Sequence, residues 1–246
     1  MLIRITNSCH MGCSHCFINA TPHGDDMTEE TFVAALRLTR RLGDPTLMIS
    51  GGEPTDHPEI VRFIELAQQY SGYVLLLSNG MWLHDPAFDD RRERILELVT
   101  GVQVTNDPRY YPRAVARFVH PKVMWETTLR QISPHGRART NGLEANRTMP
   151  LCFNLRSATR AHARMGGPLN PISAAILMLR QRGGFCTPSV NPDGNILAGE
   201  AAECCSFGRV TDHIEQLTRG VVDMKCNRCG LCDNLTAEQK AAIGET

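Results

Sequence analysis

The sequence contains no apolar run that approaches the length of a membrane span, although hydrophobic residues fill 42% of its 246 positions. An integral membrane protein is therefore not expected. The sequence also lacks an excess of charge, because 26 Lys and Arg balance 26 Asp and Glu. That balance gives no sign of non-specific nucleic-acid binding, so neither a membrane nor a nucleic acid is an expected partner. The length suits one large domain, or one domain with an appendage.

The N-terminus lacks the length and layout of a signal peptide, since residues 1–6 are typical of a strand and run directly into a cysteine motif. We therefore expect a cytoplasmic protein. In that compartment the ten cysteines are poor candidates for disulfides, and metal binding is the better interpretation. We find no convincing internal repeat and no low-complexity tract.

The first half of the chain alternates short apolar runs with helical patterns, which predicts βα units and a parallel sheet. Strands are expected at 2–6, 46–50, 73–78, 101–105 and 122–126, with a sixth near 129–132. Helices are expected at 29–42, 59–70 and 91–98. Thr28 is a suitable N-cap for the first helix, and Pro58 suits the first position of the second.

The second half begins with residues 133–150, which are rich in Gly, Pro, Arg and Asn and predict a loop. Further helices are expected at 155–165, 171–182 and 236–243. The character of the sequence changes at Gly183, after which six cysteines occur among short strands and turns. We therefore expect one domain over 1–182 and a second over 183–246.

Three cysteines near the N-terminus, Cys9, Cys13 and Cys16, are spaced as C-x3-C-x2-C. Thiolates are soft ligands that suit iron–sulfur clusters or zinc. A structural metal site normally has four protein ligands, whereas three cysteines can hold a [4Fe–4S] cluster and leave one iron open to a substrate or cofactor. The spacing alone also permits a zinc site whose fourth ligand comes from elsewhere.

Three further segments follow predicted strands, at 50–54 (Ser-Gly-Gly-Glu-Pro), 77–80 (Leu-Ser-Asn-Gly) and 102–107 (Val-Gln-Val-Thr-Asn-Asp). The two glycines of the first segment allow close approach of the backbone to a ligand, and Glu53 offers an acceptor to an ammonium group. Parallel βα folds place their sites at the carboxyl ends of strands, where all of these segments lie. Taken singly, each is a common turn.

In this order the four segments resemble the radical S-adenosylmethionine (radical SAM) superfamily over residues 1 to about 140. The resemblance implies an α/β fold with a partial (β/α)6 TIM-like barrel, and a [4Fe–4S] cluster on Cys9, Cys13 and Cys16 with an open iron site for SAM. Glu53 falls in the family's GGE motif, which binds the amino group of SAM, and His15 stands where an aromatic residue usually packs near the adenine. The residues expected to contact SAM are His15, Gly51, Gly52, Glu53, Pro54, Ser78, Asn79, Thr105 and Asn106.

The resemblance also implies an enzyme that cleaves SAM reductively to a 5′-deoxyadenosyl radical, which then abstracts hydrogen from a substrate. The electron requires a one-electron reductant such as flavodoxin or ferredoxin. No residue stands out as the general acid or base. Residues that could supply a proton or hydrogen are His23, His57, Asp107, Tyr110, Tyr111 and Cys205.

The C-terminal cysteines form a second constellation. The pattern C-x12-G-x4-C from Cys186 to Cys204, a following C-x2-C-x2-C and the Asn-Pro-Asp-Gly turn resemble the twitch and SPASM domains of some radical SAM enzymes. The segment 133–138 likewise resembles a P-x-G-R-A segment of that subgroup. The resemblance implies a small C-terminal domain with one auxiliary [4Fe–4S] cluster, since a full SPASM domain has a longer cysteine pattern. The expected ligands are Cys186, Cys204, Cys226 and Cys229, with Cys232 as an alternative to either of the last two and Cys205 as an alternative to Cys204.

Two other interpretations of these residues stay open. A structural zinc ribbon could use the same C-terminal cysteines, whereas Cys152 alone is typical of a small buried hydrophobic residue.

Residues 133–182 contain eight arginines and only Glu144 as an acid. Three of the arginines, Arg156, Arg160 and Arg164, would share one helix face. That face is the pattern of a solvated helix, or alternatively of a site for an anionic substrate.

Twitch and SPASM relatives act on peptides, proteins and small molecules. Oxidative modification of a peptide or protein is the first expectation, because an auxiliary cluster could accept an electron from a substrate radical. Modification of a small polar or phosphorylated metabolite or nucleotide is the alternative. A non-enzymatic zinc-binding interaction protein is the alternative of another class.

Overall fold

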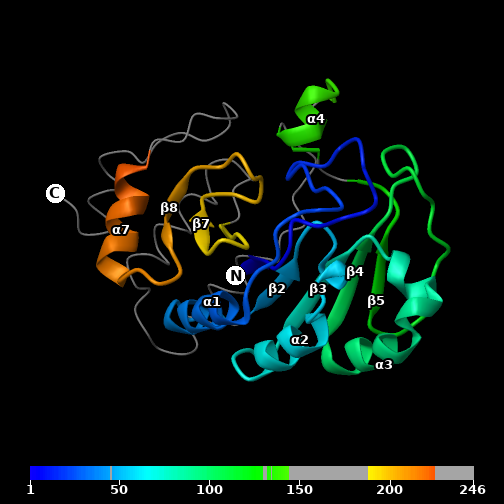
Figure 1. Ribbon diagram of the computed structural model, residues 1–246, viewed down its shortest axis with the longest axis horizontal. Helices are drawn as coiled ribbons and strands as arrows, with labels where there is room; N and C mark the ends of the chain where they lie inside the picture. The colour runs from blue at the N-terminus through cyan, green and yellow to red at the C-terminus, as the bar shows by residue number, and fades with distance from the viewer. Residues whose placement is uncertain (45, 130–131, 134, 144–187, 225–246) are drawn as a thin grey trace.

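The computed structural model describes residues 1–44, 46–129, 132–133, 135–143 and 188–224. Its centre is a mixed sheet of eight strands in the order β5-β4-β3-β2-β1-β6-β7-β8 (Figure 1). The strands are β1 (Leu2–Arg4), β2 (Leu47–Ser50), β3 (Val74–Ser78), β4 (Gly101–Thr105), β5 (Val123–Glu126), β6 (Ser189–Val190), β7 (Asn195–Leu197) and β8 (Ser206–Arg209). All pairs from β5 to β6 are parallel, and β7 and β8 continue the sheet as antiparallel neighbours.

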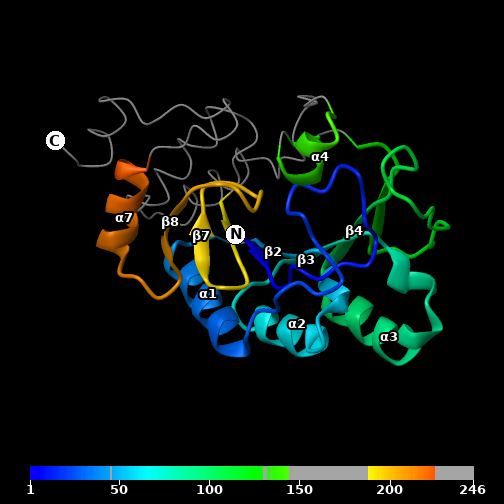
Figure 2. The ribbon, with the colours of Figure 1, turned by 45° about the horizontal axis from the view of Figure 1, so that its top comes forward.

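Three helices, α1 (Glu29–Arg41), α2 (Ile60–Gln68) and α3 (Asp89–Leu98), lie along one side of the sheet (Figures 1 and 2). The short α4 (Gly136–Thr140) lies beside the loop after β1, away from these helices in both views, and α7 (Ile214–Asp223) lies beyond β8. Three 3-10 turns complete the described elements: η1 (Pro54–Asp56), η2 (Met81–His84) and η3 (Pro86–Phe88). The Oγ1 of Thr28 caps α1 by accepting from the amide of Thr31 at 3.2 Å, as the sequence predicts.

The main hydrophobic core fills the space between the sheet and α1–α3. Alternate strand residues, including Ile3, Ile49 and Val102, are fully buried in it, and burial of such a side chain contributes roughly 1.5–3 kcal/mol. Their neighbours along β2 and β4 point to the opposite face because side chains alternate in a strand. On that face Ser50 and Gln103 are only half-buried. The sheet therefore has one apolar face under helices and one partly polar face.

The expected first five strands and first three helices are confirmed to within two residues at every boundary. Pro58 does not begin α2, because the helix starts at Ile60 after Glu59. Residues 133–150 were expected to be a loop, yet they contain α4. The expected sixth strand, at 129–132, falls partly outside the described residues. The helices expected at 155–165, 171–182 and 236–243, and the domain boundary at 182/183, also lie there, so the two-domain division stays a prediction.

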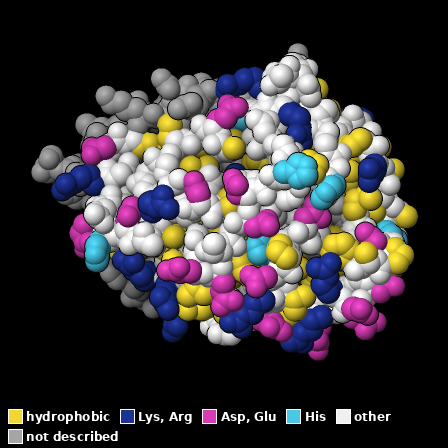
Figure 3. Space-filling view, in the orientation of Figure 1, with side chains coloured by type: hydrophobic (Ala, Val, Ile, Leu, Met, Phe, Trp, Pro, Cys, Tyr) yellow, Lys and Arg dark blue, Asp and Glu magenta, His cyan; other side chains and the backbone are white. Residues whose placement is uncertain are grey.

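The surface over α1–α3 carries acidic and basic side chains that alternate without a patch of one sign (Figure 3). Exposed ion pairs such as Arg62–Glu29 and Arg94–Glu65 connect neighbouring helices there. Pairs of this kind contribute little stability individually. Within the described part of the chain, no helix has the length and apolarity needed to cross a membrane. The helical side is therefore an ordinary solvated surface.

Candidate functional site

The loop that carries the first three cysteines follows β1 and packs into a small apolar cluster of its own. Cys9 and Cys13 are buried with Met11, and Cys16 is half-buried beside them. The amide of Cys9 donates to the carbonyl of Thr21 at 2.8 Å, which ties the loop to the returning chain. The structure therefore brings the three cysteines together on one loop, two of them shielded from water.

Burial raises the pKa of the Cys9 thiol to about 11 and that of Cys13 to about 12. Both thiols hold their protons at neutral pH unless a metal displaces them. Nowhere among the described residues do three His, Cys, Asp or Glu side chains converge as the ligands of a single metal ion do. In a cluster each thiolate binds a different iron, so cluster ligands need no such point of convergence.

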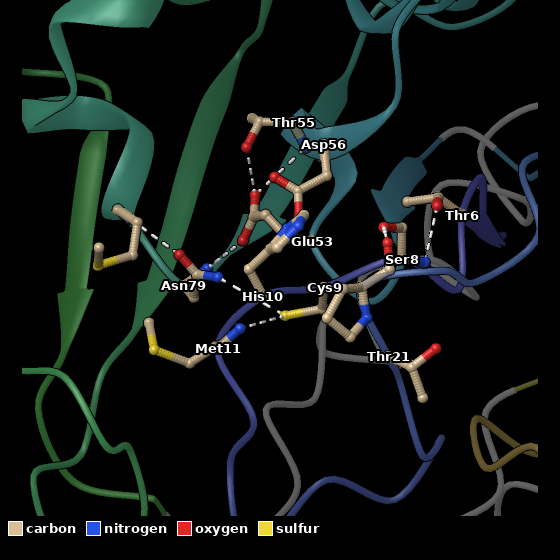
Figure 4. A network of polar contacts seen from close by, with 12 residues as sticks. Thr6, Ser8, Cys9, His10, Met11, Thr21, Glu53, Thr55, Asp56 and Asn79 are labelled. Carbon is tan, nitrogen blue, oxygen red and sulfur yellow. Dashed lines mark hydrogen bonds and ion pairs between the residues drawn. The ribbon is translucent and has the colours of Figure 1, made fainter.

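Glu53 lies directly after β2 and connects the ends of neighbouring strands (Figure 4). Its Oε1 accepts from the Oγ1 of Thr55 at 2.8 Å, the amide of Thr55 at 3.3 Å and the Oγ of Ser78 at 3.0 Å. Its Oε2 accepts from the amide of Asn79 at 2.8 Å. A carboxylate oxygen offers two lone pairs, so Oε1 is fully used and Oε2 can accept one more donor.

The Glu53 side chain is only 3% exposed. Burial raises the pKa of its carboxyl to about 7, although the hydrogen bonds from Asn79 and Thr55 act in the other direction. A cation placed at Oε2 would favour the ionised form. The environment of Glu53 therefore suits a buried ammonium group.

Gly51 and Gly52 pack against the strand and loop that precede the cysteines. The amide of Gly52 donates to the carbonyl of Thr6 at 2.8 Å. A Cβ at Gly52 would lie 2.2 Å from the carbonyl oxygen of Ser8 and 2.9 Å from the Cβ of Cys9. Glycine is thus required here because two segments of the chain approach each other closely, which holds the Glu53 turn against the cysteine loop.

The ends of β3 and β4 are joined to this turn. The Oγ of Ser78 accepts from the indole nitrogen of Trp82 at 2.9 Å while it donates to Glu53. The Nδ2 of Asn79 lies 4.0 Å from the Sγ of Cys9. The Nδ2 of Asn106 donates to the carbonyl of Asn79 at 3.5 Å. Pro54 is buried in η1 and Thr105 is half-buried at the end of β4. The structure thus gathers the predicted SAM-contacting residues of three strand ends beside Cys9.

His15 is 8% exposed and lies against Tyr110 and Tyr111, with ring centroids 5.8 and 4.8 Å apart. Burial lowers the pKa of its imidazole to about 4, so the ring is neutral. Its buried Nδ1 has no hydrogen-bond partner within the described ranges. Burial also raises the pKa of Tyr111 well above its ordinary value. These rings shield the cysteine loop on one side.

Two of the residues considered as proton donors are committed to structure. Asp107 is 1% exposed and receives bonds from the guanidinium of Arg109, at 2.6–3.2 Å, and from the amide of Leu129 at 2.8 Å. These bonds lower the pKa of Asp107 to about 2. The Nε2 of His57 contacts the carbonyl of Met27 at 3.0 Å, and its Nδ1 accepts from the amide of Glu59 at 3.1 Å. Asp107 and His57 therefore organise the fold around the site.

Sequence reasoning gave Arg137 no role at this site, although the structure places it against the cysteine loop. Its Nε donates to the carbonyl of Cys13 at 3.0 Å, and its Nη1 donates to the carbonyl of Ala20 at 2.8 Å. The amide of Arg137 donates to the carbonyl of Cys16 at 2.8 Å. The only local signal was the P-x-G-R-A resemblance, which marks the segment without indicating what it contacts.

Glu203 connects α4 to the C-terminal segment. Its carboxylate accepts from the amide of Gly136 at 3.2 Å, and it pairs with His135 at 3.4 Å and with Arg139 at 3.3 Å. Glu203 directly precedes Cys204 in the sequence. One chain of contacts therefore runs from the first cysteine loop through α4 to the segment that carries Cys204.

Only part of the second cysteine constellation can be placed. Cys204 and its alternative Cys205 lie between β7 and β8, where the carbonyl of Cys205 accepts from the amide of Ala198 at 2.8 Å. The other expected auxiliary ligands lie outside the described residues: Cys186, Cys226, Cys229 and Cys232. The auxiliary cluster and the twitch/SPASM-like domain stay predictions.

Comparison with known families agrees with this geometry. The model of the radical SAM superfamily matches residues 3–133, which is more than half of the chain. The chain therefore belongs to the radical SAM superfamily, whose members are enzymes that use a [4Fe–4S] cluster and SAM. The family membership, the α/β fold and these two cofactors of the family are as the sequence predicts.

The similarity to individual proteins is partial. A PqqA peptide cyclase of Gluconobacter oxydans is 25% identical over 91 residues, which cover 36% of this chain and 25% of that protein. A probable GTP 3′,8-cyclase of Pyrococcus abyssi is 29% identical over 110 residues, which cover 44% of this chain and 36% of that protein. The matched segment thus spans a quarter to about a third of these relatives.

Among solved structures, BtrN in complex with AdoMet and 2-DOIA superposes with a TM-score of 0.54 at 14% identity. The match covers 88% of this chain and 80% of that one. At this identity the likeness shows the fold alone. BtrN in an open conformation gives a TM-score of 0.53 over 97% of this chain and 94% of that one, so the shared fold extends beyond the residues that the superfamily model matches.

The residues present fit the cofactors of the family. Three thiols on one loop match the soft donor set of an iron–sulfur cluster, and two of them are shielded from water. The remaining acceptor position on the Oε2 of Glu53 matches the ammonium group of the SAM methionine. Because Asn79 contacts both Glu53 and the side of Cys9, the two binding features lie together.

Proposed function

We propose that this chain cleaves SAM reductively and abstracts hydrogen from a substrate, which is first a peptide or protein that is oxidatively modified. When bound, the cluster and SAM supply the one-electron bond cleavage and the 5′-deoxyadenosyl radical. The observation that carries the proposal is the position of Glu53, whose carboxylate joins the ends of β2 and β3 beside the loop of the three cysteines.

The chain's own residues bind, orient and shield. Cys9, Cys13 and Cys16 would hold the cluster, and Glu53 would orient the methionine end of SAM. The amide and guanidinium of Arg137 fix three carbonyls of the cysteine loop. The ring of Tyr111, packed against this loop and against the loop residue His15, restricts the access of water.

Anaerobic reconstitution tests the proposal directly. The full chain is treated with iron and sulfide, and SAM and dithionite are then added. The expected product is 5′-deoxyadenosine, with little or none from a Cys13→Ala variant. A Cys152→Ala variant is the matched control, since Cys152 is not an expected ligand. Stoichiometric zinc without 5′-deoxyadenosine would instead favour a zinc-binding interaction protein.

The substrate is the less constrained part of the proposal. The name of the PqqA peptide cyclase supports a peptide, and the name of the GTP 3′,8-cyclase supports a nucleotide as the second candidate. Deuterium transfer into 5′-deoxyadenosine from a labelled peptide library or from labelled nucleotides distinguishes the two. A one-electron reductant such as flavodoxin or ferredoxin is the proposed protein partner.

We also propose that the C-terminal cysteines hold one auxiliary [4Fe–4S] cluster. Support comes from Cys204, which the contacts of Glu203 and α4 connect to the first cysteine loop. An electron acceptor in this position would favour net oxidation of the substrate over rearrangement.

A further inference from the structure

Arg4, the last residue of β1, is 2% exposed. Its neighbours Ile3 and Ile5 are in the main core under the helices, so the side chain of Arg4 points to the opposite, partly polar face of the sheet. Its Nη2 donates to the backbone carbonyl of Glu200. Its Nη1 is buried and has no hydrogen-bond partner among the described residues.

A buried guanidinium without an ion-pair partner costs free energy, because the charge has left water and one of its nitrogens donates to no acceptor. Arg4 takes part in no ion pair among the described residues. Burial lowers the pKa of Arg4 to about 10, and the charge of Glu200 is the main influence in the other direction. The group therefore stays cationic at neutral pH, and its free nitrogen calls for an acceptor.

A second unpaired polar atom lies on the neighbouring strand. β1 and β6 pair in parallel with Leu2 opposite Ser189 and Ile3 opposite Val190, so Arg4 and Asn191 occupy the next positions on the same face. The buried Oδ1 of Asn191 has no hydrogen-bond partner in the part of the chain that the structure describes. The Nη1 donor of Arg4 and the Oδ1 acceptor of Asn191, both unpaired among the described residues, thus belong to neighbouring positions on one face of the sheet.

Arg4 lies opposite Ser50 in the β1–β2 pairing, beside the Gly51–Glu53 turn, but its Nη2 bonds to Glu200 in the segment after β7. The thiols of Cys16 and Cys204 are both near enough to influence Arg4 electrostatically. Both cysteine-bearing segments therefore lie near Arg4, as a substrate site between the two proposed clusters would require.

We propose that Arg4 and Asn191 bind an anionic group of the substrate, a carboxylate or phosphate whose oxygen accepts from the Nη1 of Arg4. Only the identification of this ligand as the substrate rests on the proposed function. Guanidinium groups are well matched to carboxylate and phosphate oxygens. Asn191 would bind a hydroxyl or N–H group beside the anion, as sugar phosphates and peptide carboxylates provide.

The test uses the full chain, with inorganic phosphate and acetate as separate probes at constant ionic strength. Binding is measured by calorimetry and needs neither a cluster nor SAM cleavage. Phosphate or acetate should bind wild type and lose about tenfold in affinity in Arg4→Gln, while Arg4→Lys retains part of it. Arg62→Gln, which removes an exposed arginine paired with Glu29, is the control for net charge and should bind normally.

Asn191→Asp provides a second variant in which Arg4 is intact, so misfolding of the Arg4 variants cannot obscure the result. The added negative charge should weaken anion binding about tenfold or more. Undetectable anion binding by wild type, or equal binding by wild type and variants, overturns the proposal. So does a variant that loses affinity for SAM instead, because the site would then serve the SAM carboxylate. If anions bind as expected but no 5′-deoxyadenosine forms, the anion site stands and the proposed function fails.

Discussion

The guanidinium of Arg137 donates from its Nε to the backbone carbonyl of Cys13 at a distance of 3.0 Å. The same side chain reaches the carbonyl of Ala20, and the amide of Arg137 reaches that of Cys16. One residue of α4 thus binds three carbonyls of the cysteine loop, 117–124 positions away in the sequence. The conformation of the loop therefore depends on a distant helix as well as on its own sequence.

Replacing Arg137 should loosen this loop. Hydrogen bonds from charged groups contribute about 1.5–3 kcal/mol each, and two are lost in Arg137→Met. We expect a loss of about 3–6 kcal/mol in the free energy of unfolding, measured by urea titration, and faster release of iron from the reconstituted protein. Arg139→Met is the matched control, because Arg139 is half-exposed and its ion-pair partner Glu203 keeps other bonds. Equal losses in both variants would contradict the assignment.

The binding of SAM should depend on pH through Glu53. Without a ligand the pKa of Glu53 is raised to about 7, chiefly by burial. A bound ammonium group favours the carboxylate and lowers that pKa, so binding releases a proton. The affinity for SAM should therefore rise as the pH increases from 6 to 8, by up to about tenfold per pH unit below the pKa of the free protein.

The control for this titration is Glu53→Gln, in which the side chain cannot ionise. We expect its affinity for SAM to be at least about tenfold lower than that of wild type at pH 8 and to vary little with pH. Glu30→Gln, at an exposed position of α1, should behave as wild type. A wild-type affinity that is flat between pH 6 and 8 would exclude Glu53 as the group that responds.

Gly52 should tolerate no side chain, since a Cβ would lie 2.2 Å from the backbone oxygen of Ser8. The nearest atoms are the backbone of Ser8 and the Cβ of Cys9, none of which is the flexible end of a side chain that could move away. We expect Gly52→Ala to lose more than about 2 kcal/mol of unfolding free energy and to impair cluster assembly. Gly72→Ala is the matched control, because a Cβ there meets nothing within 4 Å, and its stability should change by less than about 1 kcal/mol.

The sequence was informative where structure depends on local pattern. The alternating Leu, Ile and Val residues of β2 and β4 indicate a strand face that is buried against α1–α3. Thr28 caps α1 by bonding to an amide in the first turn of that helix. The Glu53 turn was recognisable because glycines in such a motif are needed for close approach. The carboxyl ends of parallel strands then brought Ser78 and Asn79 to it, as expected.

The unpredicted features are non-local. β6 has only two residues and β1 three, so no periodic pattern shows that they pair across more than 180 positions. The bonds of Arg137 to Cys13 and of Glu203 to Gly136 likewise join segments far apart in sequence. In the sequence Arg4 is an ordinary polar residue of a strand, because only the packed structure reveals that its Nη1 lacks a partner among the residues described.

Asp107 should contribute stability that depends on acid pH. Its pKa is lowered from 3.8 to about 2, chiefly by the bonds from Arg109. A carboxyl whose pKa is lower in the folded state stabilises the protein. This stabilisation is fully present above the pKa of the unfolded state and is lost as the pH falls toward 2. Because Arg109 is itself mostly exposed, we expect about 1–2 kcal/mol from this effect. Asp107→Asn should lose that amount at pH 7, and urea titrations should show the difference narrowing between pH 4 and pH 2.

The iron content of cysteine variants tests the ligand assignments independently of any substrate. Two [4Fe–4S] clusters require about eight irons per chain, and one requires about four. Cys13→Ala should therefore retain about four irons, held by the C-terminal cysteines, and Cys226→Ala should retain about four on the first loop. Cys152→Ala should retain all of them. The contrary result would be about four irons in wild type, which are lost in Cys13→Ala and kept in Cys226→Ala. That result would exclude the auxiliary cluster and leave one cluster, bound by the three N-terminal cysteines, as the redox centre.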